Sequence, residues 1–91
     1  MKQRAHVYIV GKVQGVFFRA WATQKAKKFD LCGWVRNVDD GKVEIVAEGE
    51  RVKINSLIKA LKKGPPLSKV KNIEIIWEKT KEEFEGFNVI R

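Results

Sequence analysis

The chain contains one cysteine, two prolines and no long apolar run. The single cysteine, Cys32, cannot form an internal disulfide bond, which fits a reducing compartment. No stretch approaches the ~18 apolar residues that a membrane-spanning helix requires, so no membrane span is expected. The N-terminal residues, Met1 to His6, lack the apolar core of a signal peptide. Together these absences predict an untargeted soluble protein of the cytoplasm.

The length and the charge limit what the chain can be. Its 91 residues have room for one domain, so residues 1–91 are expected to fold as a single unit. Nineteen Lys and Arg residues oppose eleven Asp and Glu residues, which gives a net charge of +8. Such a charge attracts anions, which include phosphorylated metabolites, nucleic acids and acidic protein surfaces. The charge by itself does not choose between these partners.

Hydrophobic periodicity predicts two helices and four main strands. Strands are expected at residues 4–10, 33–38, 43–47 and 70–77, with a short fifth strand or an edge extension at 87–90. One helix is expected from residue 18 to about residue 30. The apolar stripe of the second, which ends at Gly64, is Val52, Ile54, Leu57, Ile58 and Leu61. Asp39-Asp40-Gly41 predicts a tight hairpin turn. The order β-α-β-β-α-β predicts an α+β ferredoxin-like sandwich, with two helices on one face of an antiparallel sheet.

The connection between the first strand and the first helix is a candidate anion site. Backbone N–H groups at such a junction lack partners, and the positive end of the helix dipole adds to their effect. Gly15 allows the backbone to curl around a ligand without interference from a Cβ atom. Arg19 lies in the first helical turn, where its positive charge interacts unfavourably with the helix dipole unless an anion is bound. Its planar fork of donors matches phosphate oxygens. The alternative is a plain connection, and neither Walker nor dinucleotide-binding spacing is present.

The second candidate segment is Gly33-Trp34-Val35-Arg36-Asn37 on the second strand. Strand alternation places Trp34 and Arg36 on the face opposite Asn37. Trp34 is interpreted as core or edge packing, and Arg36 as a surface cation. An asparagine just before a turn is typical of a turn residue. If the second strand lies beside the first, however, the Asn37 carboxamide faces the loop and is able to orient a water molecule.

The two segments together resemble the signature pair of the acylphosphatase family. The matching residues are Gly11-x-Val13-Gln14-Gly15-Val16-x-Phe18-Arg19 and Gly33-Trp34-Val35-x-Asn37, with Asp40-Gly41-x-Val43 and Gly64-Pro65-Pro66 following the same pattern. The resemblance covers essentially the whole chain. It implies hydrolysis of the carboxyl–phosphate bond of a small acyl phosphate, without metal or cofactor and with inorganic phosphate as product and inhibitor. It also implies Arg19 and Asn37 as the catalytic pair. The phosphate-binding residues that it implies are Gln14, Gly15, Val16, Phe17, Phe18 and Arg19.

Two other functions stay open. RNA-recognition domains share the β-α-β-β-α-β order, but they require exposed aromatic residues on their central strands. Glu85-Gly86-Phe87 has an acid where the RNA-binding motif has a basic residue, so nucleic acid is not expected as a partner. Acylphosphatase-like domains also occur inside larger maturation enzymes that handle carbamoyl phosphate. Because the sequence ends at Arg91, a freestanding enzyme is favoured.

His6 and Cys32 are interpreted as structural. His6 has no partners in the sequence for a catalytic triad or a zinc site, so packing or solvent exposure is expected. Cys32 is interpreted as a small buried hydrophobic residue.

Overall fold

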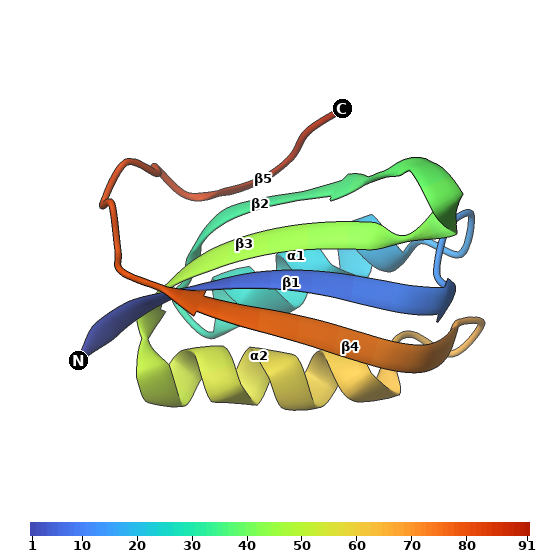
Figure 1. The fold of residues 1–91 in the computed structure, drawn as a ribbon, viewed down its shortest axis with the longest axis horizontal. Helices are drawn as coiled ribbons and strands as arrows, with labels where there is room; N and C mark the ends of the chain where they lie inside the picture. The colour runs from blue at the N-terminus through green and yellow to red at the C-terminus, as the bar shows by residue number, and fades with distance from the viewer.

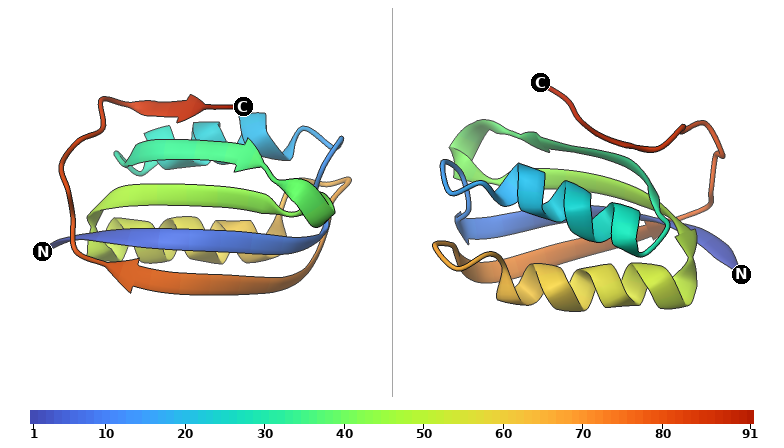
Figure 2. Two further views of the ribbon diagram at one scale, coloured as in Figure 1. Left: turned by 45° about the horizontal axis from the view of Figure 1, so that its top comes forward. Right: turned by 180° about the vertical axis from the view of Figure 1, so that it is seen from behind.

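Two helices lie across one face of a five-stranded sheet in the computed structural model, which describes residues 1–91 (Figures 1 and 2). The elements are β1 (Lys2–Lys12), α1 (Phe18–Lys28), β2 (Cys32–Asn37), the 3₁₀ turn η1 (Asp39–Gly41), β3 (Val43–Glu50), α2 (Arg51–Lys63), β4 (Lys69–Glu78) and β5 (Phe87–Val89). The strand order is β4-β1-β3-β2-β5. This confirms the predicted ferredoxin-like α+β sandwich.

The sheet differs from the prediction in one respect, because it is mixed and not wholly antiparallel. Strands β1 to β4 pair antiparallel, whereas β5 pairs parallel with β2. The chain leaves β4 at one edge, and residues 79–86 cross the end of the sheet to reach the other edge (Figure 2). The last strand therefore runs in the direction of β2.

The core lies between the helices and the sheet, as the periodicity predicts. Ala5, Val7 and Ile9 of β1 face the helices and are almost completely buried. The stripe of α2 that covers them is Ile54, Leu57, Ile58 and Leu61. Val52 was wrongly assigned to this stripe and is 73% exposed. It precedes Ile54 by two residues and therefore projects from the other side of a 3.6-residue helix. No helix of the structure is both long enough and apolar enough to cross a membrane.

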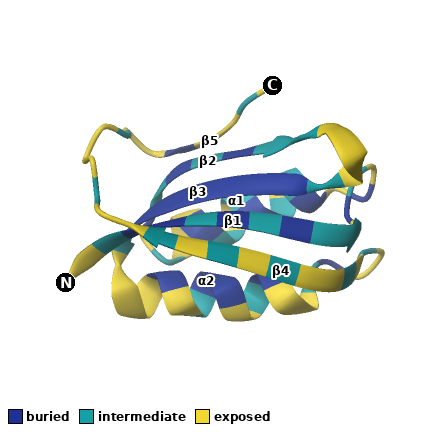
Figure 3. Ribbon diagram, viewed as in Figure 1, coloured by how far each residue is buried: buried dark blue, intermediate teal, exposed yellow.

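Strand β3 is buried on both faces, which its alternating sequence did not predict (Figure 3). On the face away from the helices, the carboxylate of Glu44 accepts hydrogen bonds from His6, Tyr8 and Arg36. The long side chains of neighbouring strands thus cover this acid. His6 is half-buried and has a partner in Glu44. Trp34 was expected in the core or at an edge, but it lies half-buried on this outer face, with the Arg36 guanidinium 5.3 Å from its ring centre.

Glu44 makes the stability of the fold dependent on pH. Burial works to raise its pKa, but the hydrogen bonds from His6, Arg36 and Tyr8 hold the pKa below its ordinary value of 4.5. The ionised carboxylate of Glu44 therefore stabilises the fold at pH values above its ordinary pKa. This contribution to stability is lost as the pH falls through the folded-state pKa.

We expect Glu44→Gln to lower the free energy of unfolding by about 1–3 kcal/mol near neutral pH. The difference from the wild type should shrink in acid, at a pH below the folded-state pKa of Glu44, where both chains lack the charge. Denaturant unfolding at the two pH values measures the effect, with Glu74→Gln, an exposed acid of β4, as the control. An equal loss at both pH values would show that the ionised form of Glu44 is not the stabilising one.

Candidate active site

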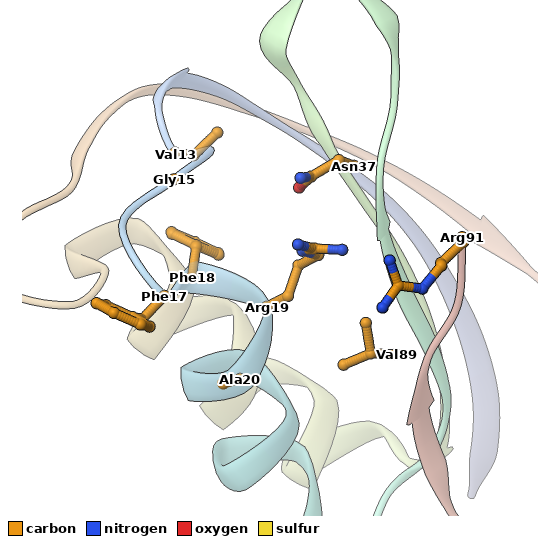
Figure 4. Close-up of a pocket in the computed structure, with 9 residues that line it drawn as sticks. All are labelled: Val13, Gly15, Phe17, Phe18, Arg19, Ala20, Asn37, Val89 and Arg91. Atoms are coloured by element: carbon orange, nitrogen blue, oxygen red, sulfur yellow. The ribbon is translucent and has the colours of Figure 1, made fainter.

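A pocket of about 360 Å³ lies where β1 leads into α1. Its lining residues are Val13, Gly15, Phe17, Phe18, Arg19, Ala20, Asn37, Val89 and Arg91. The Arg19 guanidinium and the Asn37 carboxamide point into the same space (Figure 4). Two arginines and no acidic side chain line the pocket, so its charge favours an anionic ligand.

Arg19 and Asn37 meet because α1 lies over β2. The sequence left open whether β2 lies beside β1; in the structure β3 pairs with both strands and separates them. The chain skips one strand position when it passes from β1 to β2, and α1 crosses the sheet on the way and packs against β2 and β5. The first turn of α1 consequently lies over the end of β2, where Asn37 projects towards the helices (Figures 2 and 4).

The loop before α1 has two residues with left-handed backbone conformations. Gly15 has φ 72°, which glycine adopts at little cost, and a Cβ there would meet only open space. Phe17 has φ 62° and ψ 22°, although it is not glycine, and its side chain is 81% exposed. Such a conformation costs about 1–3 kcal/mol and concentrates at functional sites. Phe17 is also the N-cap of α1, and no side chain caps the helix there. The first N–H groups of α1 therefore lack a side-chain acceptor.

Four of the six residues predicted to bind phosphate line the pocket, namely Gly15, Phe17, Phe18 and Arg19. The other two side chains point elsewhere. Gln14 donates from Nε2 to the backbone oxygens of Val38 and Lys42, at 2.9 and 2.8 Å. It thereby ties the loop to the β2–β3 turn that follows Asn37. Val16 is 7% exposed and belongs to the hydrophobic core.

Asn37 carries an unsatisfied polar atom. Its Oδ1 is buried and has no hydrogen-bond partner in the protein. A buried acceptor without a partner costs about 1–3 kcal/mol, so native proteins retain few of them. An acceptor of this kind, in a pocket that also contains Arg19, is suited to receive a hydrogen bond from a water molecule or a ligand.

Besides Val13 and Ala20, which flank the predicted loop, sequence reasoning missed two lining residues from a distant part of the chain, Val89 and Arg91. Both come from the β5 segment, which pairs with β2 and so lies beside Asn37. One ion pair and two hydrogen bonds hold the preceding crossing segment: the Arg4 guanidinium contacts Glu83, and Glu48 accepts the backbone N–H groups of Lys81 and Glu82. No local motif marks Arg91, because its position depends on a strand pairing across the sheet.

The fold and the pocket together define a small α+β domain with a cationic site at one end of its sheet. The acylphosphatase family pattern matches residues 5–89. An acylphosphatase of Methylococcus capsulatus is 43% identical, over 98% of this chain and 97% of its own length. The acylphosphatase of Pyrobaculum islandicum is 47% identical, over 96% of this chain and 93% of its own. The chain belongs to the acylphosphatase family.

Solved structures agree with this assignment. The crystal structure of acylphosphatase from Bacillus subtilis covers 100% of both chains, with a TM-score of 0.94 and 38% identity. A segment that makes up 12% of full-length HypF, solved in its phosphate- and nucleotide-bound form, matches the whole of this chain with a TM-score of 0.92 and 33% identity. The protein is thus an enzyme that hydrolyses acyl phosphates.

Proposed function

We propose that Arg19 and the backbone N–H groups of residues 14–19 bind the phosphoryl group, while Asn37 positions the attacking water. One observation carries this assignment: Arg19 and Asn37, from separate elements, line one pocket in which Asn37 Oδ1 is a buried acceptor without a partner. The residues are also those that the resemblance to the family indicates.

Arg19 is suited to hold the phosphoryl oxygens. It lies in the first turn of α1, which contains no acidic residue to balance its charge against the helix dipole. A bound anion removes this unfavourable interaction. The guanidinium offers several parallel donors, and the uncapped N–H groups at the helix start add further ones. The phosphoryl oxygens would then be contacted from two directions.

Asn37 is suited to orient a water molecule. Its Oδ1 accepts a hydrogen bond from the water, which points a lone pair of the water oxygen at phosphorus. Water then forms a new P–O bond as the bond between phosphorus and the acyl oxygen breaks. The carboxylate leaves with the electron pair, and the water's protons remain on the phosphate product or pass to solvent. Because a carboxylate is a good leaving group, positioning and charge stabilisation supply most of what the reaction needs.

No metal ion has a step in this proposal. The charge that develops on the equatorial oxygens is met by Arg19 and by backbone amides. Preorganised donors of this kind contribute about 10²–10³ in rate each. No group of three or more His, Cys, Asp or Glu side chains is placed to hold a metal ion.

Hydrolysis of benzoyl phosphate in the presence of EDTA tests the proposal. We expect turnover to be unaffected by the chelator, because the anion is held by Arg19 and amides alone. Inorganic phosphate should inhibit competitively, since it occupies the same donors. Loss of turnover in EDTA, restored by a divalent cation, would contradict metal independence. Non-competitive inhibition by phosphate would place its binding outside the pocket.

A small-molecule substrate is favoured over nucleic acid. Two aromatic residues of the outer sheet face are already engaged, since Tyr8 donates to Glu44 and Trp34 lies beneath Arg36. The negative charges of the acidic residues on this face repel the phosphate backbone of a nucleic acid. A cytoplasmic location and a single domain of residues 1–91 stay predictions from the sequence.

A further inference from the structure

We infer that the groove between α1 and the α2–β4 loop binds the acyl group of the substrate, and that the enzyme favours bulky apolar acyl groups. The groove has a volume of about 380 Å³ and is mostly apolar. Its wall residues include Phe17, Ala20, Trp21, Gln24, Pro66 and Leu67. The inference rests on the proposed positions of the phosphoryl group and the water.

The groove adjoins the pocket that contains Arg19 and Asn37. Phe17 and Ala20 line both. The acyl group is joined to phosphorus by a single bridging oxygen, so it must lie directly beside the phosphoryl group. A substrate with its phosphoryl group at Arg19 can therefore extend over Phe17 into the groove without leaving the protein surface.

The direction of the reaction selects this side of the pocket. In phosphoryl transfer the attacking and leaving oxygens lie roughly in line, on opposite sides of phosphorus. Asn37, which positions the water, lies on one side of the Arg19 guanidinium, and Phe17 and Ala20 lie on the other (Figure 4). Arg91 and Val89 come from the segment that pairs with β2, beside Asn37. The leaving acyl group is thus directed away from Arg91 and towards the groove.

The walls of the groove are held in place before any ligand binds. Trp21 packs edge-on against the buried ring of Phe18, with ring centres 5.5 Å apart. The opposite wall is a turn in which Ser68 donates both its N–H and its hydroxyl to the backbone oxygen of Pro65. Gly64 begins this turn with φ 72°, and a Cβ at that position would lie 3.3 Å from Phe18. The two walls therefore pack against the same buried ring.

The groove also accounts for two costly exposed side chains. Phe17 is 81% exposed and Leu67 is 67% exposed, and both border the groove. Exposed apolar residues that gather around a concave surface mark binding sites more often than scattered ones. An aromatic or branched acyl group would cover both and remove apolar area from water, at roughly 25 cal/mol per Å².

The ratio of kcat/KM for benzoyl phosphate to that for acetyl phosphate measures binding in the groove. Leu67→Asn should lower kcat/KM for benzoyl phosphate about fivefold and leave that for acetyl phosphate nearly unchanged. Gln24→Leu, which makes the groove more apolar, should raise the ratio about twofold. Val52→Asn is the matched control, because Val52 is an equally exposed aliphatic residue outside the groove.

Binding without turnover gives an independent readout. Benzoylmethylphosphonate has a methylene group in place of the bridging oxygen and cannot be hydrolysed. Its binding should shift the NMR signals of the Gln24 side-chain amide and the Leu67 methyl groups, whereas acetonylphosphonate should not. Equal effects of Leu67→Asn on both substrates, or none on either, would overturn the inference while leaving the enzyme's mechanism intact. Failure of the wild type on both benzoyl phosphate and acetyl phosphate would instead contradict the proposed function itself.

Discussion

Arg19→Lys is expected to lower kcat/KM at least about 100-fold, nearly as much as Arg19→Ala. An ammonium group keeps the charge but cannot make two parallel hydrogen bonds to phosphoryl oxygens. Both variants should also raise the inhibition constant of inorganic phosphate, because the product uses the same donors. Steady-state hydrolysis of benzoyl phosphate with phosphate as a competitor measures the two effects together.

Arg51→Lys is the matched control for this prediction. Arg51, like Arg19, lies in the first turn of a helix, but its guanidinium is 3.7 Å from the ring centre of Trp77 and it does not line the pocket. Lysine and arginine have similar helix propensities, so neither substitution should unfold its helix. Near wild-type turnover by Arg19→Lys would show that Arg19 supplies charge and not a paired hydrogen bond.

Asn37→Ala is expected to separate catalysis from phosphate binding. We expect kcat to fall about 100-fold or more because the attacking water loses its partner. The inhibition constant of inorganic phosphate should change by no more than about twofold, because Arg19 and the loop amides remain. The free energy of unfolding should stay the same or rise by about 1 kcal/mol, since a buried acceptor without a partner is removed.

Asn72→Ala provides the comparison on a strand away from the pocket, where an exposed asparagine of β4 is removed. It should change neither kcat nor phosphate inhibition. A loss of stability in Asn37→Ala that matches its loss of activity would assign Asn37 a structural role, as the turn residue that its position before η1 also suggests.

Local sequence patterns determined most of the fold. The 3.6-residue and two-residue periodicities placed both helices and all four main strands near their observed bounds, because each pattern is repeated within one element. The turn at Asp40-Gly41 has φ 70° and 78° at its two residues, as the Asp-Gly pair predicted. The same local logic identified the loop before α1, since Gly15 and Arg19 are both unusual for a simple connection.

Other features depend on contacts between distant residues, and only the tertiary structure decided them. The insertion of β3 between β1 and β2 follows from the pairing of whole strands. The burial of Glu44 depends on His6 and Arg36, which come from the strands on its two sides. Neither feature can be read from hydropathy, which reports only each residue's own preference for burial and not which strands pair. A buried acid, moreover, is stable only when specific partners reach it.

The site divides in the same way. Sequence alone proposed Arg19 and Asn37, and it placed Arg19 in the first turn of a helix. The tertiary structure decided that Gln14 holds a turn, that Arg91 reaches the pocket, and that an apolar groove adjoins it. These three features involve distant parts of the chain, namely the β2–β3 turn, the segment that follows β5 and the α2–β4 loop. Their side chains meet only after the strands have paired, since the chain brings them to one end of the sheet from distant positions.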